Sequence, residues 1–104
     1  MIKKEYLDCV GRLIKIEHLD ESGQVLHIDV FDIVKGYRQL GSVQYYRDNI
    51  RYMAEYFNDA GHCYCTALFD ANGRLYKQKY YNSDAELAIT QHFENGELIE
   101  IEEI

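Results

Sequence analysis

The feature that most constrains the fold of this chain is a short glycine turn that occurs three times. Each copy contains an apolar residue, an acidic residue, a small polar residue, glycine and a second apolar residue, and the copies span residues 18–25, 68–75 and 92–98. Glycine readily adopts the left-handed backbone conformation that closes short loops between antiparallel strands. The motif therefore predicts three β-hairpins.

The first hairpin can be aligned in detail, because a three-residue loop fixes which residues face each other. With the loop at residues 21–23, Ile16 lies opposite Ile28 and Glu17 lies opposite His27. Apolar side chains then share one face of the sheet, and charged side chains share the other. Glu17 and His27 could form an acid–base pair, although an exposed cross-strand pair of little energetic effect is the simpler interpretation.

In the second hairpin, the loop at residues 71–73 places Phe69 opposite Leu75 and Tyr64 opposite Tyr80. The turn residues of the three copies resemble those of the MORN-like and YD hairpin repeats. The spacing in this chain is irregular and a predicted helix interrupts it, so the resemblance is limited to the turns. We assign no family and transfer no residue roles from it.

The third hairpin has two interpretations. A loop at residues 94–96 predicts that the preceding segment is a strand. However, Ser83-Asp84-Ala85-Glu86 is also a capping box, which would begin a helix. Residues 83–93 are therefore open to either assignment.

Between the first two hairpins, the apolar residues recur at helical intervals. They are Val43, Tyr46, Ile50, Met53, Ala54 and Phe57. Ser42 can cap the start of such a helix, and Gly61 can end it. We therefore expect an α+β fold, with an antiparallel sheet of five or six strands built from β-hairpins and one long amphipathic helix packed on one face.

Composition predicts a single domain spanning residues 1–104, because the chain has no proline and no flexible linker. The first residues lack the apolar stretch of a signal peptide, and no apolar run is long enough to span a membrane. These features, together with three cysteines in no regular framework, predict a cytoplasmic protein without a membrane partner.

The charge is unevenly distributed. The net charge is −7, and the whole excess lies beyond Lys79, the last basic residue. This acidic end would repel phosphates, so we expect no direct binding of nucleic acid. A basic protein is the expected partner.

His62, Cys63 and Cys65 are the densest group of potential metal ligands. Structural zinc sites usually contain two ligand pairs at turn-like spacing, whereas this segment has one Cys-x-Cys within a predicted strand. Two small buried thiols are the simpler interpretation. We therefore expect no metal site and no cofactor.

Tyrosine is unusually frequent, with ten residues in 104. On the predicted helix, Tyr45, Tyr52 and Tyr56 form a second stripe beside the apolar one. Tyrosine is enriched at protein interfaces because it combines a large area with a polar tip. The stripe therefore indicates an interaction surface, while a wider core and a ligand pocket are the alternatives.

The C-terminal residues 97–104 alternate between apolar and acidic side chains, as in a strand with one solvated face. Glu100 and Glu102 either form that solvated face and protect an edge, or they provide an acidic surface for a basic protein.

These observations predict a non-enzymatic interaction domain of the inhibitor, immunity or adaptor type. It would present the tyrosine-rich helix and the acidic C-terminal strand to a basic protein, or it would form a homodimer. A small-molecule-binding α+β module, with a tyrosine-lined pocket between helix and sheet, is the alternative. The sequence contains no specific catalytic motif, so an enzyme is not the expected class.

Overall fold

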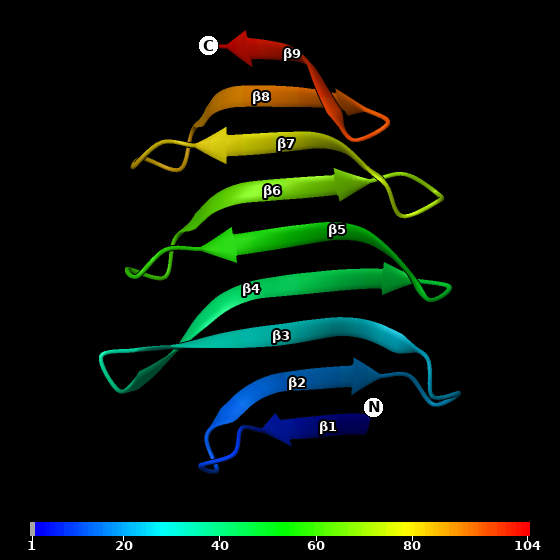
Figure 1. The fold of residues 1–104 in the computed structure, drawn as a ribbon, viewed down its shortest axis with the longest axis vertical. Coiled ribbons are helices and arrows are strands. Elements are labelled where there is room, and N and C mark those ends of the chain that lie inside the picture. Colours follow the sequence, from blue (N-terminus) through cyan, green and yellow to red (C-terminus); the bar gives the residue numbers. More distant parts are fainter. Residues whose placement is uncertain (1) are drawn as a thin grey trace.

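Nine antiparallel strands follow one another across a single sheet in the computed structural model, which describes residues 2–104 (Figure 1). The strands are β1 (Ile2–Leu7), β2 (Leu13–Leu19), β3 (Val25–Val34), β4 (Tyr37–Arg47), β5 (Ile50–Phe57), β6 (Cys63–Phe69), β7 (Leu75–Tyr81), β8 (Leu87–Glu94) and β9 (Glu97–Glu103). Each strand pairs with its neighbours in the chain, so the sheet order is the sequence order.

Five of the eight turns share one chemistry, which the turn at Asp70 illustrates. The Asp70 carboxylate accepts hydrogen bonds from the backbone N–H groups of Asn72 and Arg74, at 2.9 and 3.0 Å. Gly73 follows in the left-handed conformation, with φ of 77°. The same arrangement begins at Asp8, Asp20, Asn58 and Asn82. An aspartate or asparagine therefore begins each of these five turns.

A β-bulge follows each of these five turns and shifts the pairing by one residue. The skipped residues are Ile14, Leu26, Tyr64, Tyr76 and Ala88. In the second of these hairpins, Leu19 faces Val25 as the loop predicts, but His18 then faces His27. The predicted pairings of Glu17 with His27 and of Ile16 with Ile28 are therefore wrong.

The hairpin of β6 and β7 shows the same effect. The predicted pairing of Phe69 with Leu75 is confirmed. Tyr76 is then skipped, so that Cys65 lies opposite Tyr80, where Tyr64 was expected.

The predicted helix is wrong, because residues 43–57 belong to a hairpin formed by β4 and β5. Asp48 and Asn49 close it as a two-residue turn in which both have positive φ, 52° and 65°. Asparagine and aspartate tolerate this conformation well, and the flanking tyrosines, valine and isoleucine favour strands. The α+β fold class is therefore replaced by an all-β fold, and none of the described residues forms a helix long and apolar enough to cross a membrane.

The segment before the last hairpin is a strand from Leu87 onward. Asn82 to Glu86 form one of the five related turns, with Ala85 at φ of 63°, so the capping-box helix is wrong. The last loop has two residues, since Glu94 pairs with Glu97. The predicted three-residue loop is one residue too long.

The two faces of the sheet differ in charge. Residues that pair across strands point to the same face, so the pairing assigns each side chain. We call one side the uncharged face, because its two central rows in β3–β8 contain no charged residue: Ile28, Gln44, Ala54, Ala67, Gln78 and Gln91, and Val30, Ser42, Tyr56, Cys65, Tyr80 and Ile89. Arg51 of β5 lies beside these rows, where its guanidinium donates to Gln44 at 2.8 Å. The opposite side is the charged face, which includes Asp29, Glu55, Lys77, Lys79, His92, Glu100 and Glu102.

The sheet has only one layer within residues 2–104, and burial is correspondingly limited. The buried apolar residues are Leu19, Val43, Ala54, Cys65 and Ala67, and no large side chain is fully buried. The accessible surface is 7147 Å². A globular protein of 12.3 kDa exposes roughly 6,100 Å². About 1,000 Å² more surface is therefore open than compact packing would leave.

Candidate functional site

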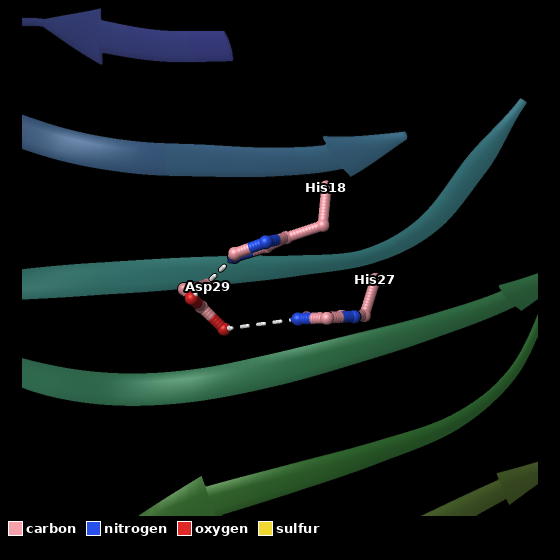
Figure 2. A group of neighbouring side chains, drawn as sticks. All are labelled: His18, His27 and Asp29. Atoms are coloured by element: carbon pink, nitrogen blue, oxygen red, sulfur yellow. Dashed lines mark hydrogen bonds and ion pairs between the residues drawn. The ribbon is translucent and has the colours of Figure 1, made fainter. Parts of the chain in front are cut away.

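The most closely grouped chemical side chains lie on the charged face, where β2 and β3 meet. His18 of β2 faces His27 of β3, and Asp29 lies two residues further along β3 on the same face. The imidazole rings stack with centroids 4.0 Å apart and planes 18° from parallel. Figure 2 shows both rings directed toward the Asp29 carboxylate.

The Asp29 carboxylate is shared between the two histidines. Its Oδ2 lies 2.8 Å from Nε2 of His18, and its Oδ1 lies 4.0 Å from Nε2 of His27. The His18 side chain is 10% exposed, while those of His27 and Asp29 are 31% and 22% exposed. The group is thus anchored at His18 and reachable from solvent at the other two residues.

Partial burial lowers the pKa of His27, and the neighbouring His18 lowers it further. The neutral imidazole is therefore favoured, and its ring nitrogen can accept a proton or a metal ion. The ring of Tyr45 on β4 lies beside His27, with centroids 5.9 Å apart.

The predicted tyrosine surface is only partly assembled. Tyr45 and Tyr52 are close, with ring centroids 6.2 Å apart. Tyr56 pairs with Ser42 and Cys65 on the uncharged face, opposite to Tyr45. The hydroxyl of Tyr45 donates to Glu55 at 2.5 Å, and this bond, together with partial burial and the nearby charge of Glu55, raises the pKa of Tyr45 to about 12. A helical stripe of three tyrosines does not exist.

The predicted acidic residues lie at the other end of the sheet. Glu100 and Glu102 project from β9 on the charged face, where His92 of β8 lies 4.0 Å from the first and 2.5 Å from the second. Five strand spacings separate β9 from β4, which is about 24 Å. Tyr45 and these glutamates therefore share the charged face but are far apart on it.

The weak metal-ligand candidates His62, Cys63 and Cys65 do not form a group of three potential ligands within residues 2–104. His62 lies in the exposed turn after β5, where its N–H donates to Asn58. Cys65 is buried, which raises the pKa of its thiol, and the Cys63 sulfur contacts Thr66 at 3.8 Å. Among residues 2–104, the groups of three potential ligands are His18, His27 and Asp29, and His92, Glu100 and Glu102.

The sequence interpretation missed the group at His18, His27 and Asp29 because of one residue. The predicted register, with Glu17 opposite His27, implies that His18 lies opposite Leu26, whereas the bulge at Leu26 brings His18 opposite His27. The recurring turn and bulge pattern is the signal that would have located it.

The surface hollows among the described residues do not lie between a helix and the sheet, where the pocket was predicted. One of about 410 Å³ lies at the turn end of the sheet, lined by residues that include Asn58, His62, Tyr81 and Asn82. Tyr45, Tyr52 and Tyr56 do not line it, although Tyr52 lines a second hollow of about 360 Å³ together with Arg47 and Phe69. The alternative of a pocket between helix and sheet is wrong, since the helix that would form one wall is a hairpin.

Residues 31–103 match the family model of the GtfB middle domain, which is well over half of the chain. No curated protein sequence is significantly similar to the chain.

Several solved structures share the fold. The chain superposes on TarM of S. aureus, in a G117R mutant bound to fondaparinux, alpha-GlcNAc-glycerol and UDP, with a TM-score of 0.71 and 21% identity over 90% of this chain and 18% of that one. For a GtfA/B complex, the TM-score is 0.69 and the sequence identity is 12%, over 98% of this chain and 19% of that one. For the structure of accessory secretory proteins 1, 2 and 3 in Streptococcus pneumoniae, the TM-score is 0.66 and the sequence identity is 16%, over 90% of this chain and 17% of that one.

The chain therefore spans about a fifth of the length of the solved chains that it matches. The predicted inhibitor, immunity or adaptor domain with a tyrosine-rich helix is wrong, because the family match indicates another class and the described residues contain no helix.

Proposed function

We propose that this chain, which belongs to the GtfB middle domain family, is a β-sheet assembly domain of a glycosyltransferase-related protein. Its role is to bind a partner chain of the glycosyltransferase assembly through the uncharged face. The single-layered sheet is the observation on which this proposal depends.

The energetic support comes from the surface that the sheet leaves open. The excess of about 1,000 Å² over a compact protein of this mass is comparable to the roughly 800 Å² that one partner contributes to a standard interface. Covering apolar surface contributes about 25 cal/mol per Å² before the losses of association. A partner on the sheet would therefore replace the second layer that this chain lacks.

The charge distribution supports the choice of face. A charged side chain is costly to bury without a partner of opposite sign, and interface centres are depleted of charge. The two central rows of the uncharged face in β3–β8 contain alanine, glutamine, tyrosine, serine, cysteine, valine and isoleucine. The opposite face has lysines and carboxylates in the corresponding positions.

The similar structures support a protein as the occupant. Two of them are complexes, GtfA/B and the accessory secretory proteins 1, 2 and 3. A further GtfA/B structure is bound to UDP and GlcNAc, and TarM is bound to UDP. Since this chain corresponds to about a fifth of each of those chains, we propose that it contributes assembly and that the sugar-transfer chemistry belongs to other parts.

The test places positive charge on each face in turn. Gln78→Lys with Gln91→Lys adds two charges to the uncharged face, on β7 and β8. The control, Thr66→Lys with Thr90→Lys, adds the same two charges to the opposite face, on β6 and β8. Binding to a co-expressed glycosyltransferase chain from the same organism is measured by sedimentation velocity.

We expect at least tenfold weaker binding for the glutamine variant and less than a twofold change for the threonine control. Circular dichroism verifies that both remain folded. Equal weakening by both variants would contradict the assignment of the face. A chain that binds no glycosyltransferase, or that only dimerises, would contradict the proposed function.

A further inference from the structure

The arrangement of two imidazoles and one carboxylate on neighbouring strands has a use beyond assembly. We propose that His18, His27 and Asp29 bind one divalent transition-metal ion, such as zinc, and that solvent completes its coordination. The ion would connect β2 to β3 on the charged face. The proposal is independent of the partner, because it concerns the face opposite to the proposed interface.

The distances between donor atoms favour this site. Zinc binds imidazole nitrogen and carboxylate oxygen at about 2.0–2.2 Å, so two ligand atoms in a tetrahedral site are roughly 3.4 Å apart. The observed separations from Asp29 oxygens are 2.8 Å to His18 and 4.0 Å to His27, and all three donor atoms lie within 4.8 Å of one another. Shifts of less than about 1 Å therefore convert the observed geometry into a coordination geometry.

The backbone holds the two histidines in this position. His18 and His27 are directly paired across the two strands, and the stacked rings present Nε2 of both to the same carboxylate (Figure 2). The bulge at Leu26 creates this pairing. The ligands therefore come from paired strands and lose little conformational freedom on binding.

The protonation states also suit a metal. Metal ions bind the neutral form of imidazole, so each histidine must present an unprotonated ring nitrogen to the ion. At His18, the hydrogen bond to Asp29 occupies Nε2. When an ion binds there, the Nε2 proton moves to Nδ1 of the same ring, and the nitrogen lone pair and the carboxylate oxygen both face the ion. Two neutral imidazoles and one carboxylate leave a net charge of +1 with a divalent ion.

The group at His92, Glu100 and Glu102 is the less suitable of the two. Its glutamate side chains are 63% and 60% exposed on the edge strand β9, and it offers one imidazole. Solvated carboxylates retain their water and bind transition metals less selectively than imidazoles do. It therefore serves as the internal comparison in the test.

The test titrates the metal-free 104-residue chain with Zn²⁺ by isothermal titration calorimetry. We expect one equivalent to bind. Loss of an outer-shell partner alone weakens metal sites about 10–100-fold, so loss of a ligand in His27→Gln or Asp29→Asn should weaken binding by at least about 100-fold. These two residues are chosen because both are more exposed than His18, and circular dichroism verifies folding. Co²⁺ gives a second readout, since its visible absorption reports nitrogen and oxygen coordination.

The other two histidines provide the controls. His62→Gln, in an exposed turn, should leave the affinity for Zn²⁺ unchanged, and so should His92→Gln. Retained binding in His27→Gln and Asp29→Asn, with loss in His92→Gln, would overturn the proposal. The absence of saturable binding to the wild-type chain would also overturn it, whether or not the uncharged face binds a partner.

Discussion

The middle and the edges of this sheet have similar strand chemistry but very different burial. Ala54 of β5 and Ala67 of β6 are 0% and 1% exposed, whereas every residue of β1 and β9 is exposed. Ala54 and Ile101 belong to the same row of the uncharged face, yet Ile101 is 51% exposed. The row is continuous, and only the position within the sheet differs.

This difference shows that residues in a single-layered sheet are buried by the side chains of the two neighbouring strands. A central strand has a partner on both sides, and side chains from both partners cover its small residues. An edge strand has one partner and no second layer. The cost of a substitution should therefore depend on strand position more than on residue type.

The largest expected effect is that of Ala54→Asp. The carboxylate would be buried, because the flanking positions in its row are Gln44 and Ala67 and the Arg51 guanidinium beside them already donates to Gln44 at 2.8 Å. An uncompensated buried charge costs about 3–5 kcal/mol, comparable to the whole stability of a small domain. We expect the variant to be largely unfolded, as measured by urea denaturation followed by circular dichroism.

The matched control is Ile101→Asp, which introduces the same side chain in the same row on β9. Exposed substitutions usually change stability by less than about 0.5 kcal/mol. Equal losses for the two variants would show that β9 is covered as fully as β5, and the comparison between centre and edge would then be wrong.

A medium effect is expected from Tyr45→Phe, which removes the central hydrogen bond to Glu55. A bond to a charged acceptor contributes about 1.5–3 kcal/mol, and partial exposure favours the lower end. Because the folded chain raises the pKa of Tyr45 to about 12 from its ordinary 10.0, this stabilisation is complete below pH 10 and is lost as the pH rises through 12. The difference in unfolding free energy between wild type and variant should shrink over that range.

The edge provides a matched bond for comparison. The hydroxyl of Tyr6 on β1 donates to Glu17 on β2, and this bond is exposed. Tyr6→Phe should not measurably change the unfolding free energy at pH 7. A loss as large as that of Tyr45→Phe would contradict the difference between centre and edge.

The sequence predicted the hairpins closed within residues 18–25, 68–75 and 92–98, because the glycine turn specifies them locally, but it missed the related turns that begin at Asp8, Asn58 and Asn82. It failed at residues 43–57, where valine, tyrosine and isoleucine happened to recur at helical intervals. The signal that should have prevailed was Asp48-Asn49, a pair that tolerates the two positive φ angles of a tight turn. Without that hairpin, the number of strands and the absence of a helix could not be predicted.

The grouping of the candidate metal ligands His18, His27 and Asp29 was not predicted, for a different physical reason. A single β-bulge has no strong sequence signal apart from the recurring turn that precedes it, and one skipped residue moves every later side chain to a new partner. Leu26 shifts His18 from the predicted partner to His27. The charged C-terminal strand, by contrast, was predicted correctly as a strand with one acidic face, because its alternation is visible without knowing any partner.

The smallest of the expected losses is that of Asn58→Ala, in the turn between the central strands β5 and β6. The Asn58 side chain accepts hydrogen bonds from the N–H groups of Ala60 and His62, both at 3.0 Å. Removing a side chain that satisfies backbone donors in this way costs about 1 kcal/mol at helix caps, and an exposed turn should be similar. Asp8→Ala removes the same two bonds beside the edge strand β1 and should lower the chemical-denaturation midpoint less. Asp8 also accepts a hydrogen bond from the Arg12 guanidinium at 2.8 Å, so a smaller loss at Asp8 despite this additional bond would show that the edge strands depend less on their turn than the central strands do.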